Sequence, residues 1–331
     1  PFVVVDVAVI GALREQLASL LKPCVDHVEF AEFSGECSAS QIDAMAVKAA
    51  AASSDLIITI GGGKAIDTAK GVRILRGGAI IVVPTVASND APTSRLAIVY
   101  TDDHVLKEVR LMPTNPDAVI VDTSIIARAP RRFFVAGIGD ALSKKFEAEQ
   151  CFNSGGMNFY KARPAGLAVA IANQCYQVIR RDAVASLAAA DSKEPDAAFE
   201  NIVEATILLS GLGFESGGLS IAHSLTRGFS ALPSLNASLH GEQVAFGLLA
   251  QFCLEQRPAD FLIDMIGFYK QLGLPTSLTN LGFSGDVAEG IQVIAERSVA
   301  EAPYLKQFVG AVTVETVAAA LTKANGLAKA A

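Results

Sequence analysis

Two histidines seventeen residues apart, His223 and His240, are the first candidates for chemistry in this sequence. The chain has four histidines in all, and these two lie in a glycine-rich segment that carries few charges. Imidazole nitrogens bind zinc and other first-row metals, and a third ligand with one open position would make such a site catalytic. Each histidine could instead cap a helix or fill a polar gap in the core. The spacing alone favours that structural interpretation.

Asp140 supplies a possible third ligand in the sequence AGIGDAL, which we expect to open the first helix of a second domain. An aspartate near a helix start is most often an N-cap. Together with His223 and His240 it would instead form a set of one carboxylate and two imidazoles, with remaining positions for water or substrate. His27, in a predicted strand, and His104, in a predicted hairpin turn, are interpreted as structural.

A second motif is a run of three glycines and a lysine, Gly61, Gly62, Gly63 and Lys64, between a predicted strand and a predicted helix. Glycines let a ligand approach the backbone closely, and the start of the following helix presents N–H groups to a phosphate. The run matches neither the P-loop pattern nor the GxGxxG pattern of dinucleotide-binding proteins. A structural turn needs one glycine rather than three, so we favour a pyrophosphate site.

The loop at 84–94, PTVASNDAPTS, follows the next predicted strand. Ligands of open α/β sheets bind beyond the carboxyl ends of the strands, where this loop and the glycine run both lie. Thr85, Ser88 and Ser94 can donate hydroxyls to phosphate or ribose oxygens. Asp90 fits an Asx turn before Ala-Pro as well as it fits a contact to substrate.

The composition bounds the class of protein. A chain of 331 residues with 51% apolar and 18% charged residues predicts two domains with large cores, and some apolar surface buried between subunits. The net charge of −7, without a long basic run, disfavours nucleic-acid binding. No apolar run is long enough to predict a membrane span, and no signal peptide predicts export. The five scattered cysteines fit reduced thiols in a cytoplasmic protein.

Two kinds of element position these motifs. Residues 1–130 alternate apolar strands with helical patterns, which predicts a Rossmann-like α/β domain with a mostly parallel sheet and an inserted antiparallel hairpin at 95–112. Residues 131–331 show helical periodicity with almost no strand signal, which predicts an all-α domain. Because the chain begins inside a strand pattern, we expect the N-terminus to be incomplete.

Six blocks of sequence carry a resemblance to a known family. In order, they are IITIGGGKAIDTAKG, VPTVASNDAPTS, NPDAVIVDTSIIARAP, VAGIGDALSKKFEAE, LLSGLGFESGGLSIAHSL and LHGEQVAFG. The chain resembles the glycerol dehydrogenases of the iron-containing (group III) alcohol dehydrogenase superfamily over nearly its whole length. The resemblance implies the superfamily's architecture, also found in dehydroquinate synthases: a nucleotide-binding α/β domain and a helical metal- and substrate-binding domain.

The resemblance also implies the site residues. By matching position, Asp140, His223 and His240 are the metal ligands, with zinc expected and iron as the alternative, and His223 also borders the substrate. Asp90 matches a residue that contacts the polyol. Nine residues match stretches that hold NAD: Asp6, Gly61, Gly62, Lys64, Thr85, Ser88, Ser94, Leu96 and Tyr100. A carboxylate at Asp6 accepts from ribose hydroxyls and repels a 2′-phosphate, which favours NAD over NADP.

The implied reaction is the reversible, NAD-dependent oxidation of glycerol to dihydroxyacetone, with other vicinal diols as possible substrates. A metal-bound alkoxide would transfer hydride to NAD. Dehydroquinate synthases and glycerol-1-phosphate dehydrogenases share the architecture, but their substrates need cationic phosphate partners, and the blocks around the ligands offer only Lys144, Lys145 and Arg227. A non-catalytic, metal-stabilised binding protein is the third alternative. We expect a cytoplasmic homo-oligomer, with an octamer as the assembly that the resemblance suggests.

Thr226 is the main departure from the family pattern, because relatives often carry a further histidine there. That histidine is usually not a ligand, so we expect a change in the polarity of the substrate pocket rather than loss of the metal.

Overall fold

The computed structural model describes residues 1–102 and 105–330, without the side chains at positions 12, 13, 329 and 330. The chain divides into two compact units, Pro1–Ala129 and Pro130–Ala331. The expected hairpin-turn residues Asp103 and His104 lie outside the described residues.

The first unit is built on a five-stranded parallel sheet with the strand order β2-β1-β3-β4-β7. Its strands are β1 (Phe2–Asp6), β2 (Glu29–Phe33), β3 (Leu56–Gly61), β4 (Ala79–Pro84) and β7 (Ala118–Val119). The central strand β3 is apolar along almost its whole length because a parallel sheet is covered on both faces.

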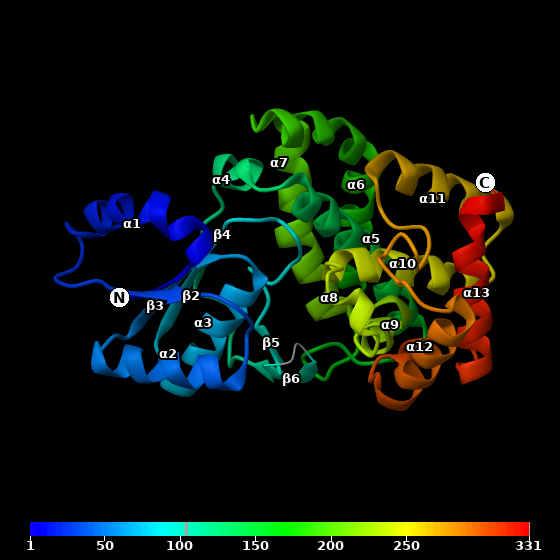
Figure 1. The fold of residues 1–331 in the computed structure, drawn as a ribbon, viewed down its shortest axis with the longest axis horizontal. Coiled ribbons are helices and arrows are strands. Elements are labelled where there is room, and N and C mark those ends of the chain that lie inside the picture. Colours follow the sequence, from blue (N-terminus) through cyan, green and yellow to red (C-terminus); the bar gives the residue numbers. More distant parts are fainter. Residues whose placement is uncertain (103–104, 331) are drawn as a thin grey trace. The chain divides into compact units, whose positions relative to one another are not determined.

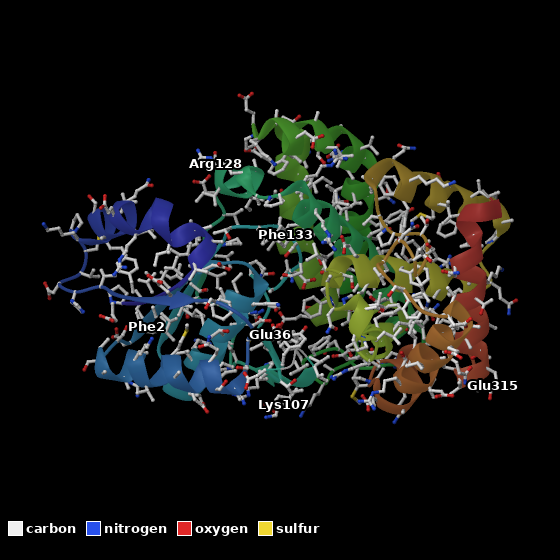
Figure 2. All side chains as sticks on the ribbon, in the orientation of Figure 1. Phe2, Glu36, Lys107, Arg128, Phe133 and Glu315 are labelled. Carbon is white, nitrogen blue, oxygen red and sulfur yellow. The ribbon has the colours of Figure 1, made fainter. Side chains whose placement is uncertain are left out.

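Helices cover both faces of this sheet (Figure 1). Helix α1 (Val7–Leu21) packs on the face that includes Val3 and Ile58. Helices α2 (Ala39–Ala51) and α3 (Gly63–Arg76) pack on the other face, where Phe2, labelled in Figure 2, is fully buried. A short helix, α4 (Thr123–Arg128), ends the unit. This arrangement confirms the predicted Rossmann-like α/β class.

The predicted hairpin is also present. Strands β5 (Leu96–Tyr100) and β6 (Leu106–Leu111) pair antiparallel as a separate two-stranded sheet that contacts α3. His27, by contrast, does not lie in a strand as predicted. Strand β2 begins two residues later, at Glu29, and the exposed imidazole lies 3.5 Å from the carboxylate of Glu29. The apolar alternation that defines the strand starts only after this histidine.

The second unit is helical throughout the residues described, as the periodicity predicted. Its α-helices are α5 (Arg131–Asn153), α6 (Gly166–Ser192), α7 (Ala197–Glu204), α8 (Ser210–Gly217), α9 (Ile221–Phe229), α10 (His240–Leu254), α11 (Ala259–Leu272), α12 (Val287–Glu301) and α13 (Val314–Ala330). A π-helical turn (Ala205–Leu209) joins α7 to α8, and short 3₁₀ turns occupy Pro233–Leu235 and Leu305–Gln307.

Helix α5 is the centre of this unit. It packs against α6, α8, α9 and α10, and most of its residues are buried. A helix that is buried on all sides has no solvated face for charged residues. The charged side chains that α5 does bury, Asp140, Lys144 and Glu147, therefore need partners within the protein.

One helical run, Ala197–Gly217, is long and apolar enough by length and composition to cross a membrane. Core helices of water-soluble proteins pass the same test, and 56% of its most apolar window is buried inside the unit. The run packs on α5 and α6 through α8 and α7.

Candidate metal and nucleotide sites

Three ionisable side chains lie on one face of helix α5. Asp140, Lys144 and Glu147 are spaced by four and three residues, which places them one above the other along a helix. Their side chains are at most 1% exposed. Asp140 is the tenth residue of α5, so it does not cap the helix as its position near the helix start suggested. Its buried carboxylate instead contacts Lys144 and His223.

Helix α10 brings His240 to Asp140 through a contact between glycines. A Cβ atom at Gly241 would overlap the carbonyl oxygen of Ala136 on α5, and a Cβ at Gly139 would lie 2.7 Å from the carbonyl oxygen of Gly241. Because glycine has no side chain, the two backbones can touch here. Gly139 directly precedes Asp140 on α5, and Gly241 directly follows His240 on α10. The His240 Nε2 atom lies 3.9 Å from Asp140 Oδ1.

The start of α10 is fixed by a second set of contacts. The carboxylate of Glu242 accepts a hydrogen bond from the backbone N–H of Leu239, the N-cap residue of the helix. The same carboxylate accepts two hydrogen bonds from Arg132, at 2.6 and 2.7 Å. Because His240 is the first residue of α10, these contacts hold the backbone from which its side chain projects.

Glu147 fixes the other histidine. One carboxylate oxygen accepts from the backbone N–H groups of Ser220 and His223, at 2.9 and 3.0 Å, and so caps helix α9 from outside. The other oxygen lies 2.5 Å from His223 Nδ1. With Nδ1–H donating to Glu147, Nε2 carries the lone pair, and it lies 3.2 Å from Asp140 Oδ1.

The resulting cluster has the donor set of a metal centre. Ligand atoms of Asp140, His223 and His240 all lie within 4.8 Å of one another. Asp140 Oδ2 is buried, and the described part of the chain offers it no hydrogen-bond partner. A buried carboxylate oxygen without a partner is costly unless a cation binds it. One carboxylate and two imidazoles fit zinc or ferrous iron.

Charge interactions and burial shift the pKa values of Asp140 and His240. Burial opposes the ionisation of Asp140, but the ammonium of Lys144 and the two imidazoles outweigh it and hold the pKa of this carboxyl well below its usual range. Burial of the ring nitrogens against the protein, only partly offset by the charge of Asp140, lowers the pKa of the His240 imidazole to about 4. His240 is therefore neutral at pH 7, and 41% of its side chain is exposed.

His223 and Glu147 form a coupled pair. Burial alone would favour the neutral form of each, but their mutual attraction is stronger, so it lowers the pKa of Glu147 and raises the pKa of His223. The carboxylate of Glu147 is thus ionised and anchors the imidazole.

In the first unit, the two predicted nucleotide loops lie together at the carboxyl edge of the sheet. Gly61 ends β3 beside Pro84, which ends β4, and Thr85 donates its N–H to the carbonyl oxygen of Gly61. A Cβ at Gly62 would lie 3.3 Å from the side chain of Val86. Gly62 precedes α3 without a side-chain cap, so no side chain at the N-cap position occupies the first N–H groups of that helix.

Asp6 lies next to this glycine run. It ends β1 and caps α1 by accepting the N–H of Ala8 at 2.9 Å. A Cβ at Gly61 would come within 3.0 Å of the Cβ of Asp6. The structure therefore brings together Asp6, the glycines and Thr85. Ser88 is half-buried three residues further along the loop.

Other predicted nucleotide residues have structural partners. The exposed ammonium of Lys64 lies 2.8 Å from the buried carboxylate of Glu36, which Figure 2 labels. Lys70 of α3, fully buried, donates to the hydroxyl of Ser94 at 3.3 Å and to the carbonyl oxygen of Leu96 at 2.6 Å. Leu96 and Tyr100 lie at alternate positions of β5 and so share one face of that strand.

The turn around Asp90 is made by its neighbours. The side chain of Asn89 accepts the N–H of Ala91 at 3.1 Å, which is the Asx-turn bond that the sequence suggested for Asp90. The backbone carbonyl of Asp90 accepts from Thr93, and the residue is 9% exposed. A contact between Asp90 and the substrate remains a prediction.

Sequence reasoning missed Glu147 and gave Lys144 no part in the metal site. A signal was present in the spacing of Asp140, Lys144 and Glu147 along one helix face within an apolar segment. Without the position of α9, however, nothing in the sequence pairs Glu147 with His223, 76 residues away.

Known proteins share both sequence and fold with this chain. The family model described as iron-containing alcohol dehydrogenase matches residues 1–123. The glycerol dehydrogenase of Escherichia coli O6:H1 (strain CFT073) is 38% identical over 98% of this chain and 88% of its own length. The chain belongs to the iron-containing alcohol dehydrogenase family.

Two further relatives place it within that family. The glycerol dehydrogenase of Thermotoga maritima is 41% identical over 80% of this chain and 73% of its own length. The crystal structure of a probable glycerol dehydrogenase from Sinorhizobium meliloti superposes with a TM-score of 0.94 at 38% identity, covering all of this chain and 91% of the other. Both the α/β first unit and the helical second unit thus follow the architecture of this family.

Proposed function

We propose that this oxidoreductase catalyses the reversible, NAD-dependent oxidation of glycerol to dihydroxyacetone, with other vicinal diols as further substrates. The observation that carries the proposal is the cluster of Asp140, His223 and His240, the first two of them buried, in a chain about 40% identical to glycerol dehydrogenases. The nucleotide loops of the first unit supply the second requirement, a site for the hydride acceptor.

Asp140, His223 and His240 would hold the metal, for which we propose zinc, with ferrous iron as the alternative. A metal bound there supplies Lewis-acid chemistry, which lowers the pKa of a coordinated alcohol and orients it for hydride loss. Glu147 contributes by fixing the tautomer and orientation of His223. The exposed edge of His240 leaves a side from which substrate can enter.

We propose that the glycine run, Thr85 and Ser88 bind the pyrophosphate of NAD and that Asp6 accepts from the adenosine ribose. The uncapped start of α3 supports a phosphate contact. The carboxylate of Asp6 beside Gly61 supports a preference for NAD over NADP. For Lys64, Ser94, Leu96 and Tyr100 we propose contacts to the rest of the dinucleotide, and for Asp90 a contact to the polyol.

Two of the three cations in the sequence blocks around the ligands, Lys144 and Lys145, are held by other groups of the helical unit. Lys144 is buried against Asp140, and the ammonium of Lys145 lies 4.6 Å from the centre of the Tyr176 ring and 4.0 Å from Glu149. Because both lysines already have partners, neither presents an unpaired charge to a phosphate group.

We also propose a cytoplasmic homo-oligomer, with an octamer as the assembly to test by light scattering. Leu208 and Leu212, four residues apart on the helical run Ala197–Gly217, are 41% and 40% exposed. Large apolar side chains on one exposed helix face are typical of a surface that contacts another subunit.

The test of the function is NAD reduction over a panel of alcohols. The panel contains glycerol, propane-1,2-diol, ethanol and glycerol 1-phosphate, and the protein is assayed as purified, after chelation, and after adding zinc or iron back. We expect turnover with the vicinal diols, loss on chelation and recovery with one metal. Undiminished activity in protein shown to be free of metal would contradict the metal assignment, and a preference for glycerol 1-phosphate would contradict the substrate.

A further inference from the structure

The ammonium group of Lys144 lies against two of the three proposed ligand atoms. Its Nζ is 2.6 Å from Asp140 Oδ1 and 3.0 Å from His223 Nε2, and those two atoms are themselves 3.2 Å apart. The side chains of Lys144 and Asp140 are each 1% exposed. Water therefore does little to screen the charges in this group.

A divalent metal bound by the same atoms would lie close to this ammonium. Zinc bonds carboxylate oxygen at about 2.1 Å. Since Nζ is 2.6 Å from Asp140 Oδ1, a metal bonded to that oxygen can be no more than about 4.7 Å from Nζ, whichever side it binds from. A charge of +2 and a charge of +1 at this separation in a buried site repel each other strongly. Both cations would also draw on the same two side chains, because the ammonium already contacts the Asp140 carboxylate and the free nitrogen of the His223 ring.

We propose that Lys144 is a tethered cation that competes with the metal for Asp140 and His223. By neutralising Asp140, it stabilises the packing of α5 when the metal is removed, and it weakens metal binding so that the metal can exchange. The ring of Phe214, whose centre is 5.4 Å from Nζ, offers the displaced ammonium a cation–π contact. The inference rests on the proposed metal site.

The test compares zinc binding and metal-free stability in three variants. Lys144→Met removes the charge and keeps the volume of the side chain, whereas Lys144→Gln removes the charge but keeps a donor for Asp140. Lys145→Met is the matched control, because it removes the same charge one residue along α5, where Nζ lies near Tyr176 and Glu149 instead of the ligands. Zinc affinity is measured by competition with a chromophoric chelator after metal has been stripped from each protein.

We expect both Lys144 variants to bind zinc at least about tenfold more tightly than the unsubstituted protein, because the competing positive charge is gone. Without zinc, Lys144→Met should unfold at a lower temperature, since Asp140 is left buried without a counter-charge. Lys145→Met should change neither quantity.

Equal or weaker zinc binding in both Lys144 variants would overturn the inference. Tight binding in Lys144→Met but not in Lys144→Gln would also overturn it, because the hydrogen bond and not the charge would then be the competitor. If the unsubstituted protein and a His240→Ala variant bind zinc equally well, the metal site itself is wrongly assigned. A zinc-loaded protein that does not oxidise glycerol would contradict the proposed function and leave the competition between Lys144 and zinc intact.

Discussion

The proposed metal site of the second unit and the proposed nucleotide loops of the first are stabilised by different kinds of contact. In the cluster, four buried ionisable side chains fix one another: Asp140, Lys144, Glu147 and His223. In the loops, the close contacts are made by glycine backbone, and two of the charged residues proposed to bind the nucleotide, Asp6 and Lys64, are partly or largely exposed. Removing one charge should therefore impair stability or activity strongly in the cluster and only slightly in the loops. Adding a Cβ atom should lower stability wherever two backbones touch.

The largest effect on activity is expected for His240→Ala, which removes one ligand while leaving the first unit unchanged. Loss of Lewis-acid chemistry should lower kcat/KM for glycerol by about a thousandfold or more. NAD affinity, measured by fluorescence titration, should stay within about twofold, the level that separates an independent site from a coupled one. A comparable fall in NAD affinity would show that the two sites depend on each other.

The largest effect on stability is expected for Gly241→Ala. The new methyl group overlaps the carbonyl oxygen of Ala136, so α10 must move away from α5 at a cost of about 3 kcal/mol. We expect a lower thermal unfolding midpoint and weaker zinc binding, because His240 moves with α10.

Gly267→Ala on α11 is the matched control for that prediction, since nothing lies within 4 Å of a Cβ built there. Replacing this glycine within a helix should stabilise the protein by up to about 1 kcal/mol. Equal unfolding midpoints for the two variants would show that the contact between α5 and α10 is not tight.

A smaller effect is expected for Glu147→Gln, which keeps the shape of the side chain. An amide offers one acceptor oxygen, so it cannot accept both from the N–H groups at the start of α9 and from His223 Nδ1. We expect zinc affinity to fall about 10- to 100-fold, as is common when the partner of a ligating histidine is lost. Glu149→Gln, on the same helix beside Lys145, should leave zinc affinity unchanged.

The smallest effect is expected for Asp6→Asn in the first unit. Asparagine also caps helices, so α1 keeps its hydrogen bond while the negative charge is lost. The ratio of kcat/KM for NADP to that for NAD should rise about tenfold, which corresponds to about 1.4 kcal/mol. Asp43→Asn, exposed on α2, is the control for the change in net charge. An unchanged ratio would place the ribose away from Asp6.

Sequence patterns were most informative where a single element decides the outcome. The apolar run of β3 followed by three glycines predicted both a buried parallel strand and a loop at its carboxyl end. The loss of the strand pattern near residue 130 predicted the change from an α/β unit to a helical unit. Local patterns failed where a boundary depended on a few residues: His27 lies before β2, and Asp140 lies within α5 instead of capping it.

By itself, the sequence determined the class of each unit, because periods of two and of 3.6 residues record which faces are buried. It also determined the residue types available for a metal and a phosphate. The spacing and the resemblance pointed to Asp140, His223 and His240, but only the tertiary structure shows how they meet: they come from three helices, two of which, α5 and α10, touch at Gly139 and Gly241. It also decided the part played by Glu147, because a buried charge takes its role from the groups that neutralise it, and His223 is 76 residues away in the sequence.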